Sequence, residues 1–564
     1  MMDRRTLLGG AIAGTSLRAL GGVGALGSAG GLSGAGVLAG LPATAQAQGS
    51  AATSSLDPHG AMVWARGVEG QRRADLGNGT FLNPVFAGDH PDPSLLRVGD
   101  DYYLTFSSFD AYPGIMIWHS RDLVNWAPVG SALTRPIGSV WAPDLTAHNG
   151  RFYCYIPART ADYKSIYVIH ADRIGGPWSA PIDLGLNIHI DPCHVRDTDG
   201  TRWLFLSGGD RVRLSADGLS TAGPVEHVYD PWHYPTDWVV ETFAPEGPKL
   251  TRRDGWWYMT TAVGGTAGPP TGHMVIMARS RSLAGPWQND PANPIIRTQD
   301  AREKWWSRGH ATPFEGPDGA WWMLYHGYEN GYWTLGRQAL LEPVTWGADG
   351  WLKPQGGDLS TPLAKPVDRG AQPHGMALSD DFSRDRLGES WAFYNPGPNE
   401  RARVRRADGA MIMAAKGTSP TDCSPLCVLA GDQRYQFEVD VEVQGGADAG
   451  LLLFYNSRLY AGLGLNARGL TMHRYGLQRA RGAVLGADGA PAQRLRLRVT
   501  NDRNIVTIHT RAPDDADWRK FDVQMEVSGY HHNVAYDFLS LRPALYCAGG
   551  SGQAVFRDFR YAAL

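Results

Sequence analysis

One sequence unit recurs five times between residues 100 and 322, and this repeat restricts the possible folds more than any other feature. Each copy is a turn followed by an aromatic-rich strand, at a spacing of about 50 to 65 residues. The copies are Asp100-Asp101-Tyr102-Tyr103, Asn149-Gly150-Arg151-Phe152-Tyr153, Asp199-Gly200-Thr201-Arg202-Trp203, Asp254-Gly255-Trp256-Trp257-Tyr258 and Asp318-Gly319-Ala320-Trp321-Trp322. An antiparallel unit of this length cannot bury both faces alone, and stacking such units radially makes a β-propeller. The repeat therefore predicts five blades over residues 80–364. A β-sandwich would instead show turn signals every 8–12 residues.

A second pattern begins near Leu378, where the repeat ends. Its strands alternate apolar and polar residues, as in Arg494-Leu495-Arg496-Leu497-Arg498-Val499, which is typical of a sheet with one wet face. Residues 378–564 are therefore expected to form an antiparallel β-sandwich. Residues 365–377 contain Pro, Gly and His and are the expected linker. The whole chain is predicted to be all-β.

The N-terminus has the features of an export signal. Arg4 and Arg5 precede a long Gly/Ala/Leu stretch that ends in Ala45-Gln46-Ala47, which is an A-x-A processing site. Residues 1–47 therefore resemble a twin-arginine signal, with residues 48–79 as an extension of the mature protein. This interpretation predicts a periplasmic or secreted protein that has no membrane anchor once the signal is removed.

Charge and cysteine content exclude several classes of protein. The formal net charge is -3, and it becomes -5 when Asp3, Arg4, Arg5 and Arg18 are removed with the signal (-3 - 3 + 1), so no basic patch suits nucleic acid. A neutral polymer is the better partner, and the 20 Trp and 22 Tyr suit β-structure or sugar stacking. The five cysteines include no C-x-x-C pair that would indicate zinc. Only Cys423 and Cys427 are expected to be able to bridge, and at least one thiol stays free.

Ionisable residues occupy equivalent positions in all five repeats. Counting back roughly 9 to 12 residues from each aromatic pair reaches Asp92, Asp144, Asp191, Glu246 and His310. The first strand of each propeller blade lines the central channel, so these side chains should converge on one axis. An Asp before Pro is by itself usually a turn residue. Five ionisable groups in one register are hard to explain structurally, because they would repel and desolvate one another, and they indicate a functional site.

The motifs around these residues resemble glycoside hydrolase family 43, which contains β-xylosidases, α-L-arabinofuranosidases and arabinanases. The resemblance covers roughly residues 80 to 355. It rests on His90-Pro91-Asp92-Pro93-Ser94, Trp118-His119-Ser120-Arg121-Asp122-Leu123-Val124-Asn125-Trp126, Trp141-Ala142-Pro143-Asp144, Asp191-Pro192, Glu246-Gly247-Pro248 and Gly336-Arg337. It implies a five-bladed propeller and an inverting mechanism with Asp92 as general base, Glu246 as general acid, and Asp191 as the residue that orients the acid and raises its pKa. Inversion needs such a separated acid and base.

The same resemblance assigns substrate contacts. Arg337 would contact sugar hydroxyls, Phe109 and Trp141 would face the sugar, and His310 matches a central histidine that in some members lies near a calcium or sodium ion. No cofactor is required by this interpretation, and a hydrogen-bonded histidine without metal is an alternative role for His310. Glu241 is a rival for the general acid. A strand offset of five residues would put it on the opposite face from Glu246.

The C-terminal region resembles the concanavalin-like sandwich found in many β-xylosidases of this family, where it shapes the pocket. The sequence therefore favours an exo-acting inverting glycosidase of plant-cell-wall oligosaccharides or polysaccharides, with β-xylosidase as the main hypothesis. An α-L-arabinofuranosidase, or another furanoside- or galactan-directed hydrolase, remains an alternative, since pocket loops decide between sugars that differ at single hydroxyls. A sugar-binding propeller without catalysis is an alternative of another class.

Overall fold

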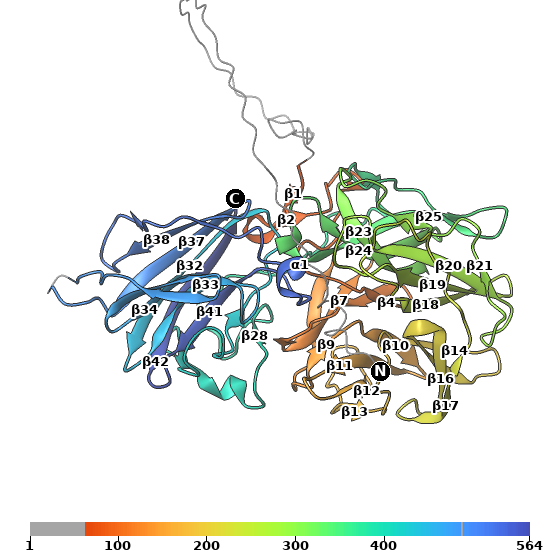
Figure 1. Ribbon diagram of the computed structural model, residues 1–564, viewed down its shortest axis with the longest axis horizontal. Coiled ribbons are helices and arrows are strands. Elements are labelled where there is room, and N and C mark those ends of the chain that lie inside the picture. The colour runs from red at the N-terminus through yellow and green to blue at the C-terminus, as the bar shows by residue number, and fades with distance from the viewer. Residues whose placement is uncertain (1–62, 487–488) are drawn as a thin grey trace, which may run out of the picture. The chain divides into compact units, whose positions relative to one another are not determined.

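The computed structural model describes residues 63–486 and 489–564 and consists almost entirely of antiparallel β-structure (Figure 1). The twin-arginine-type signal expected at residues 1–47 lies outside the described residues. Within the described part, no helix is long and apolar enough to span a membrane.

Five sheets, each built around four consecutive antiparallel strands, make up the propeller (Figure 1, orange to green). Their innermost strands are β4 (Ser94–Val98), β10 (Asp144–His148), β14 (Cys193–Arg196), β18 (Glu246–Arg253) and β23 (Trp305–Glu315). The predicted aromatic strands are the second strand of every blade, namely β5 (Asp101–Thr105), β11 (Arg151–Arg159), β15 (Arg202–Leu206), β19 (Trp256–Val263) and β24 (Trp321–Glu329). The five-bladed propeller predicted from the repeat is confirmed.

The two outer strands complete each blade. They are β7 (Gly114–Ser120) and β8 (Ala127–Leu133), β12 (Lys164–Ala171) and β13 (Ile182–Asp183), β16 (Asp210–Leu214) and β17 (Thr221–His227), β20 (Met274–Ser280) and β21 (Gln288–Asn289), and β25 (Arg337–Trp346) and β26 (Leu352–Pro354). Short strands β9 (Ser139–Val140) and β22 (Ile296–Arg297) pair with β11 and β20. The two ends of the propeller meet where β3 (Thr80–Phe81) pairs with β27 (Leu363–Ala364).

Two large sheets form the C-terminal sandwich (Figure 1, cyan to blue). The first contains, in order, β36 (Leu477–Ala480), β35 (Gly469–Arg474), β34 (Tyr460–Asn466), β33 (Asp448–Phe454), β41 (Arg542–Ala548), β31 (Leu426–Cys427), β28 (Ala392–Tyr394) and β6 (Ala111–Tyr112). The second contains β29 (Val404–Ala407), β30 (Ala410–Ala414), β42 (Gln553–Ala563), β32 (Arg434–Gln444), β37 (Arg494–Asp502), β38 (Ile505–Arg511) and β39 (Arg519–Lys520), with β40 (Met525–Glu526) also on β38.

Alternating burial creates the sandwich core. Along β37, Leu495, Leu497 and Val499 are buried while the arginines between them are only partly buried, as the period-two pattern predicts. These side chains join one apolar cluster formed by both sheets. The strand β6 belongs to the propeller sequence but pairs with β28, so one loop of blade one extends a sandwich sheet. The prediction of a β-sandwich is thus confirmed, and the sequence pattern gave no indication of this shared strand.

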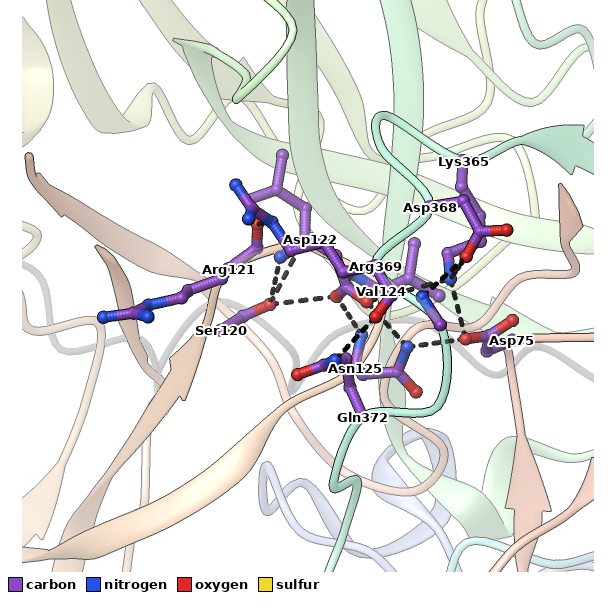
Figure 2. Close-up of polar contacts among 12 residues, drawn as sticks. Asp75, Ser120, Arg121, Asp122, Val124, Asn125, Lys365, Asp368, Arg369 and Gln372 are labelled. Carbon is purple, nitrogen blue, oxygen red and sulfur yellow. Dashed lines mark hydrogen bonds and ion pairs between the residues drawn. The ribbon is translucent and has the colours of Figure 1, made fainter. Parts of the chain in front are cut away.

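The linker is attached to the propeller by a buried lysine. The Lys365 side chain is 2% exposed, and its Nζ lies 2.8 Å from Asp75 Oδ2 and 3.8 Å from Asp122 Oδ2 (Figure 2). Asn125 Nδ2 donates to both of these carboxylates, at 2.7 and 2.8 Å. Burial alone would raise the pKa of Asp75, but the hydrogen bonds from Lys365 and Asn125 hold it below its ordinary value. The start of the linker is therefore fixed to the closing strands and to blade one.

All five cysteines are buried and free. The expectation that Cys423 and Cys427 could form a disulfide is therefore wrong for this structure. Cys427 lies in β31 and Cys423 in the loop before it, where both pack into an apolar cluster with Tyr460 and Tyr546. Burial raises the pKa of the Cys423 thiol above its ordinary range and keeps it protonated.

Candidate active site

The predicted site residues lie at the inner ends of the blades. Asp92 and Asp191 lie two residues before β4 and β14, Glu246 begins β18, and His310 lies within β23. Asp92, Asp191 and His310 have φ angles of 58°, 56° and 61°. Residues other than glycine rarely adopt this left-handed conformation, and such strain concentrates at functional sites. The backbone therefore marks three of the five positions that the repeat register selected.

Asp92 is a buried carboxylate held by cationic and polar groups. Arg337 Nη1 lies 2.9 Å from Asp92 Oδ1, and the Ser107 hydroxyl donates to Oδ2. Its backbone N–H donates to His326 Nδ1 at 3.0 Å. Burial alone would raise the pKa of Asp92, but Arg337, His310 and His326 together hold it well below the ordinary value. Asp92 is thus ionised at neutral pH and can accept a proton.

His310 lies between two carboxylates. Its Nε2 is 3.3 Å from Asp191 Oδ2 and 4.0 Å from Asp92 Oδ1. Burial alone would lower the pKa of His310, yet the negative charges of Asp92, Asp191 and Glu246 raise it above its ordinary value. A partly or fully protonated imidazole at the centre reduces the mutual repulsion of these carboxylates.

Asp191 is connected to the start of the strand that carries Glu246. The backbone N–H of Gly247 donates to Asp191 Oδ2 at 3.0 Å. Gly247 has a φ of 62°, and a Cβ there would lie 2.6 Å from His310 Nε2, so only glycine fits. The Glu246 side chain is 18% exposed, and its Oε1 lies 3.6 Å from His273 Nε2. Asp191, His310 and Glu246 therefore form one contiguous group.

The fourth acid of the register has a different environment. Asp144 forms a buried ion pair with Lys249, with Nζ and Oδ1 2.8 Å apart, and accepts from the backbone N–H of His194 at 2.8 Å. Lys249 lies three residues after Glu246 on β18. Asp144 is therefore neutralised inside the propeller and holds blades two, three and four together.

Glu241, the rival acid, is not on the strand that carries Glu246. It is exposed and lies in the loop before β18, so the argument from strand faces did not apply. Its Oε2 accepts from the backbone N–H of Ala267 at 2.8 Å. Glu241 therefore supports a surface loop.

An aromatic wall borders Arg337. The guanidinium carbon of Arg337 lies 5.5 Å from the Phe109 ring centroid and 5.3 Å from that of Phe538. Phe538 stacks on Phe109 at 5.9 Å and meets Trp141 edge-on at 5.8 Å. Phe109 and Trp141 were predicted, but Phe538 belongs to the C-terminal region and was missed. Its sequence neighbourhood carries no repeat that would indicate this position.

A second residue of the C-terminal region also reaches the site. Arg542 Nη2 lies 3.2 Å from Asp89 Oδ2, and Asp89 Oδ1 accepts from the backbone N–H of Arg337 at 3.2 Å. A Cβ at Gly336 would lie 2.4 Å from Asp89 Oδ1, and φ there is 73°. The turn that presents Arg337 is thus held through Asp89 by Arg542, which no motif or repeat in the sequence indicates.

The surroundings of His310 do not fit the calcium or sodium ion that the family resemblance implies. Asp92 is already paired with Arg337, and both Asp92 and Asp191 face the imidazole of His310. Among the described residues, no three His, Cys, Asp or Glu side chains are arranged to hold a metal ion.

Comparison with known proteins agrees with this geometry. The family model for glycosyl hydrolases family 43 matches residues 81–352. A non-reducing end α-L-arabinofuranosidase of Bacteroides ovatus is 32% identical over 383 residues, covering 61% of this chain and 68% of that protein. A xylan 1,3-β-xylosidase of a Vibrio species is 34% identical over 316 residues, covering 48% of this chain and 57% of that protein.

A solved structure extends the similarity to the C-terminal sandwich. The crystal structure of a xylan β-1,4-xylosidase from Bacillus halodurans is similar with a TM-score of 0.74 and 26% identity, covering 85% of this chain and 99% of that chain. The predictions of a hydrolase of this family and of its two-part β-fold are confirmed. The carboxylates and histidines at the centre of the propeller thus belong to a glycoside hydrolase, and the chain is a member of glycosyl hydrolase family 43.

Proposed function

We propose that this protein is an inverting exo-glycosidase of plant-cell-wall oligosaccharides, and specifically a β-xylosidase. The observation that carries this proposal is the convergence of Asp92, Asp191 and Glu246 around the single imidazole of His310. Similarity to xylosidases over nearly the whole of one solved chain supports the choice of sugar. The similarity to an α-L-arabinofuranosidase keeps that activity as the second candidate.

In this mechanism Asp92 accepts a proton from water as the water attacks the anomeric carbon. Arg337 keeps Asp92 ionised and orients it. Glu246 delivers a proton to the leaving oxygen on the opposite face of the sugar, so that one step inverts the anomeric centre. Glu246 is half-buried, as an acid that must reach a departing group should be.

Asp191 has an indirect role in the proposed reaction. Its hydrogen bond from Gly247 fixes the start of the strand that presents Glu246. Its charge also disfavours ionisation of a neighbouring carboxyl, since like charges resist joint ionisation. We assign Asp191 as the residue that positions the acid and keeps it protonated near neutral pH.

The aromatic wall supports action at a chain end. Phe109, Trp141 and Phe538 lie together beside Arg337. Phe109 is 3% exposed and supports the wall from behind, whereas Trp141 and Phe538 are half-buried and their rings can face one terminal sugar. This proposal also includes export, based on Arg4, Arg5 and the A-x-A site at residues 45–47. Cell fractionation that finds the protein only in the cytoplasm would contradict export.

Product stereochemistry is the direct test of the mechanism. Proton NMR of a 4-nitrophenyl β-D-xyloside reaction at early times should show the α-anomer of xylose first, with the β-anomer appearing by mutarotation. A parallel assay with the α-L-arabinofuranoside ranks the two candidate substrates. Early β-xylose would require a nucleophile in place of a base and would overturn the assignment of Asp92. Absence of hydrolysis across a glycoside panel would favour a sugar-binding propeller.

A further inference from the structure

Two buried histidines connect the proposed base to the proposed acid. His326 lies in β24, and its Nδ1 is 3.0 Å from the backbone nitrogen of Asp92 and 3.2 Å from Asp92 Oδ1. Its Nε2 is 3.2 Å from Nδ1 of His273, which immediately precedes β20. His273 Nε2 is 3.6 Å from Glu246 Oε1. Both rings are 0% exposed, so a buried row runs from Asp92 through His326 and His273 to the half-buried Glu246.

Both histidines are neutral in this environment. Burial lowers the pKa of His326 to about 3, and it lowers that of His273 well below the ordinary value. The positive charges of Arg337 and His310 act in the same direction on both rings, whereas Asp92 opposes them. A neutral imidazole has one N–H and one acceptor nitrogen. Each ring can therefore accept a hydrogen bond at one nitrogen and donate one from the other, and the tautomer decides which nitrogen does which.

Two orientations of this row keep the hydrogen bond between His326 and His273, and they differ in whether His326 Nδ1 donates to the Asp92 carboxylate or accepts from the Asp92 backbone N–H. In one, His326 Nδ1–H donates to the Asp92 carboxylate, His273 Nδ1–H donates to His326 Nε2, and His273 Nε2 is an acceptor facing Glu246. In the other, the Asp92 backbone N–H donates to His326 Nδ1, His326 Nε2–H donates to His273 Nδ1, and His273 Nε2–H faces Glu246. The first orientation suits a protonated Glu246, and the second suits an ionised one.

The surrounding chain makes room for His273. A Cβ on Gly309 would lie 2.4 Å from His273 Nδ1, and the φ angle of Gly309 is outside the range that requires glycine. The glycine is thus needed for the space that the ring occupies. His273 Nε2 has no hydrogen-bond partner among the described residues, although it is buried. Buried nitrogens are normally paired, and catalytic hydrogen bonds that are long in the free enzyme tighten in the substrate complex.

We propose that His326 and His273 are positioning residues that couple the protonation state of Glu246 to that of Asp92. With Asp92 ionised and accepting from His326, the row presents an acceptor to Glu246 and favours its protonated form. This pair of states is the one that reacts in the proposed inverting hydrolysis, on which the inference rests. The other charged groups facing the row are Arg337, His310 and Asp191, and all three stay in place in the test variants.

Two substitutions of His273 test its contact with His326 and its contact with Glu246 separately. His273→Asn keeps a polar group near His326 but cannot reach Glu246, and His273→Gln keeps one near Glu246 but loses the contact with His326. Both substitutions should move the basic limb of the kcat/KM pH profile to lower pH, by about one pH unit for His273→Asn. At pH values above that limb, this shift corresponds to about a tenfold loss of kcat/KM for substrates whose leaving group must be protonated. Aryl xylosides whose leaving group needs no protonation should lose much less.

A matched control is His473→Asn in the sandwich. His473 is also 0% exposed, and its Nε2 is hydrogen-bonded to the Tyr546 hydroxyl at 2.7 Å. This variant should lower thermal stability without moving either limb. Unchanged limbs in a folded, active His273→Asn enzyme would overturn the coupling. A wild-type enzyme that hydrolyses no glycoside would instead overturn the proposed function, so the two failures are distinguishable.

A measurement on the unmodified active site covers the case in which the His273 variants do not fold. In protein labelled with ¹⁵N-histidine, the ring signals of His326 should change tautomer across the pH range of the basic limb. The same signals should not respond in Glu246→Gln, whose amide does not titrate. His326 signals that are constant in the wild type, or that change equally in both proteins, would contradict the proposed coupling.

Discussion

Phe538 of the C-terminal sandwich stacks on Phe109 of the propeller, with ring centroids 5.9 Å apart and an interplanar angle of 20°. The guanidinium of Arg337 lies over both rings. The C-terminal region thus forms part of the wall beside the proposed base Asp92. On the proposed function, this relationship would bring the sandwich into contact with the sugar.

Phe538→Ala should raise KM for short xylosides while affecting kcat less, because the stacked aromatic pair contributes about 0.5–1.5 kcal/mol beyond its buried area. We expect about a three- to tenfold rise in KM, measured by steady-state kinetics. Tyr536→Ala is the control, since Tyr536 is 65% exposed on the same loop. Equal effects of the two substitutions would show that only the loop conformation matters.

Glu246→Gln should reduce kcat on unactivated xylosides by about 10²–10⁴-fold, the usual contribution of a general acid. An aryl xyloside with a good leaving group should be much less affected, and comparing the two substrates measures the dependence on protonation. Glu241→Gln should change activity little, because Glu241 is exposed and bonded to Ala267. A larger loss in Glu241→Gln would reverse the assignment of the acid.

Arg542→Gln should reduce kcat/KM by about tenfold, because small displacements of a positioning group are costly. Arg542 acts on the site through Asp89, which accepts from the backbone N–H of Arg337. Burial raises the pKa of Asp89, and Arg542 and Arg337 oppose that rise. Without Arg542, Asp89 should hold the turn at Arg337 less firmly. The matched control is Arg560→Gln, whose side chain is 66% exposed and pairs with Asp558. Wild-type kinetics in Arg542→Gln would exclude this route of positioning.

Lys365→Met should destabilise the protein by about 3–5 kcal/mol, because it leaves Asp122 buried without its cation and Asp75 with only the more distant Arg73, 3.9 Å away (Figure 2). Denaturant unfolding monitored by Trp fluorescence measures this change. Lys353→Met removes an exposed pair with Asp349 and should change the free energy of unfolding by about 0–1 kcal/mol. If both variants unfold at the wild-type midpoint, the buried cluster contributes nothing to stability.

Acid should destabilise the fold before the carboxylates titrate. Burial lowers the pKa of a set of histidines to about 3 or 4, namely His90, His194, His326, His374, His473 and His532. Since the unfolded chain has the higher histidine pKa, it binds protons first. Stability is therefore complete above about pH 6.5 and falls as the pH drops toward 4. His310, whose pKa is raised, acts in the opposite direction.

The melting temperature should accordingly fall steeply between pH 6.5 and pH 4.5. His90→Gln removes one of these groups, and its melting temperature should depend less on pH over this interval. A melting temperature that is constant down to pH 4.5 would show that these rings protonate without unfolding the protein.

The sequence predicted the blades because their determinants are local. In each repeat, the turn and the aromatic strand form a hairpin with the preceding strand, which is the innermost strand of the blade. The site residue lies at or near the start of that innermost strand, as Asp191 does before β14. The register could not distinguish Asp144, because its partner Lys249 comes from another blade. Phe538, Arg542 and His273 reach the site from loops or from the other sheet system. Such long-range contacts leave no periodic signal in one sequence.

The pairing of β6 with β28 limits how this enzyme could be divided or recombined. If the chain were cut at the linker, the catalytic half would lose the neighbour of β6, next to Phe109 in the aromatic wall. The other half would expose β28 at the edge of the seven strands that remain of its sheet. Exposed edges pair with other chains. Gene fusions that replace the C-terminal region with an unrelated binding module should therefore yield a protein with both an altered pocket and a tendency to aggregate.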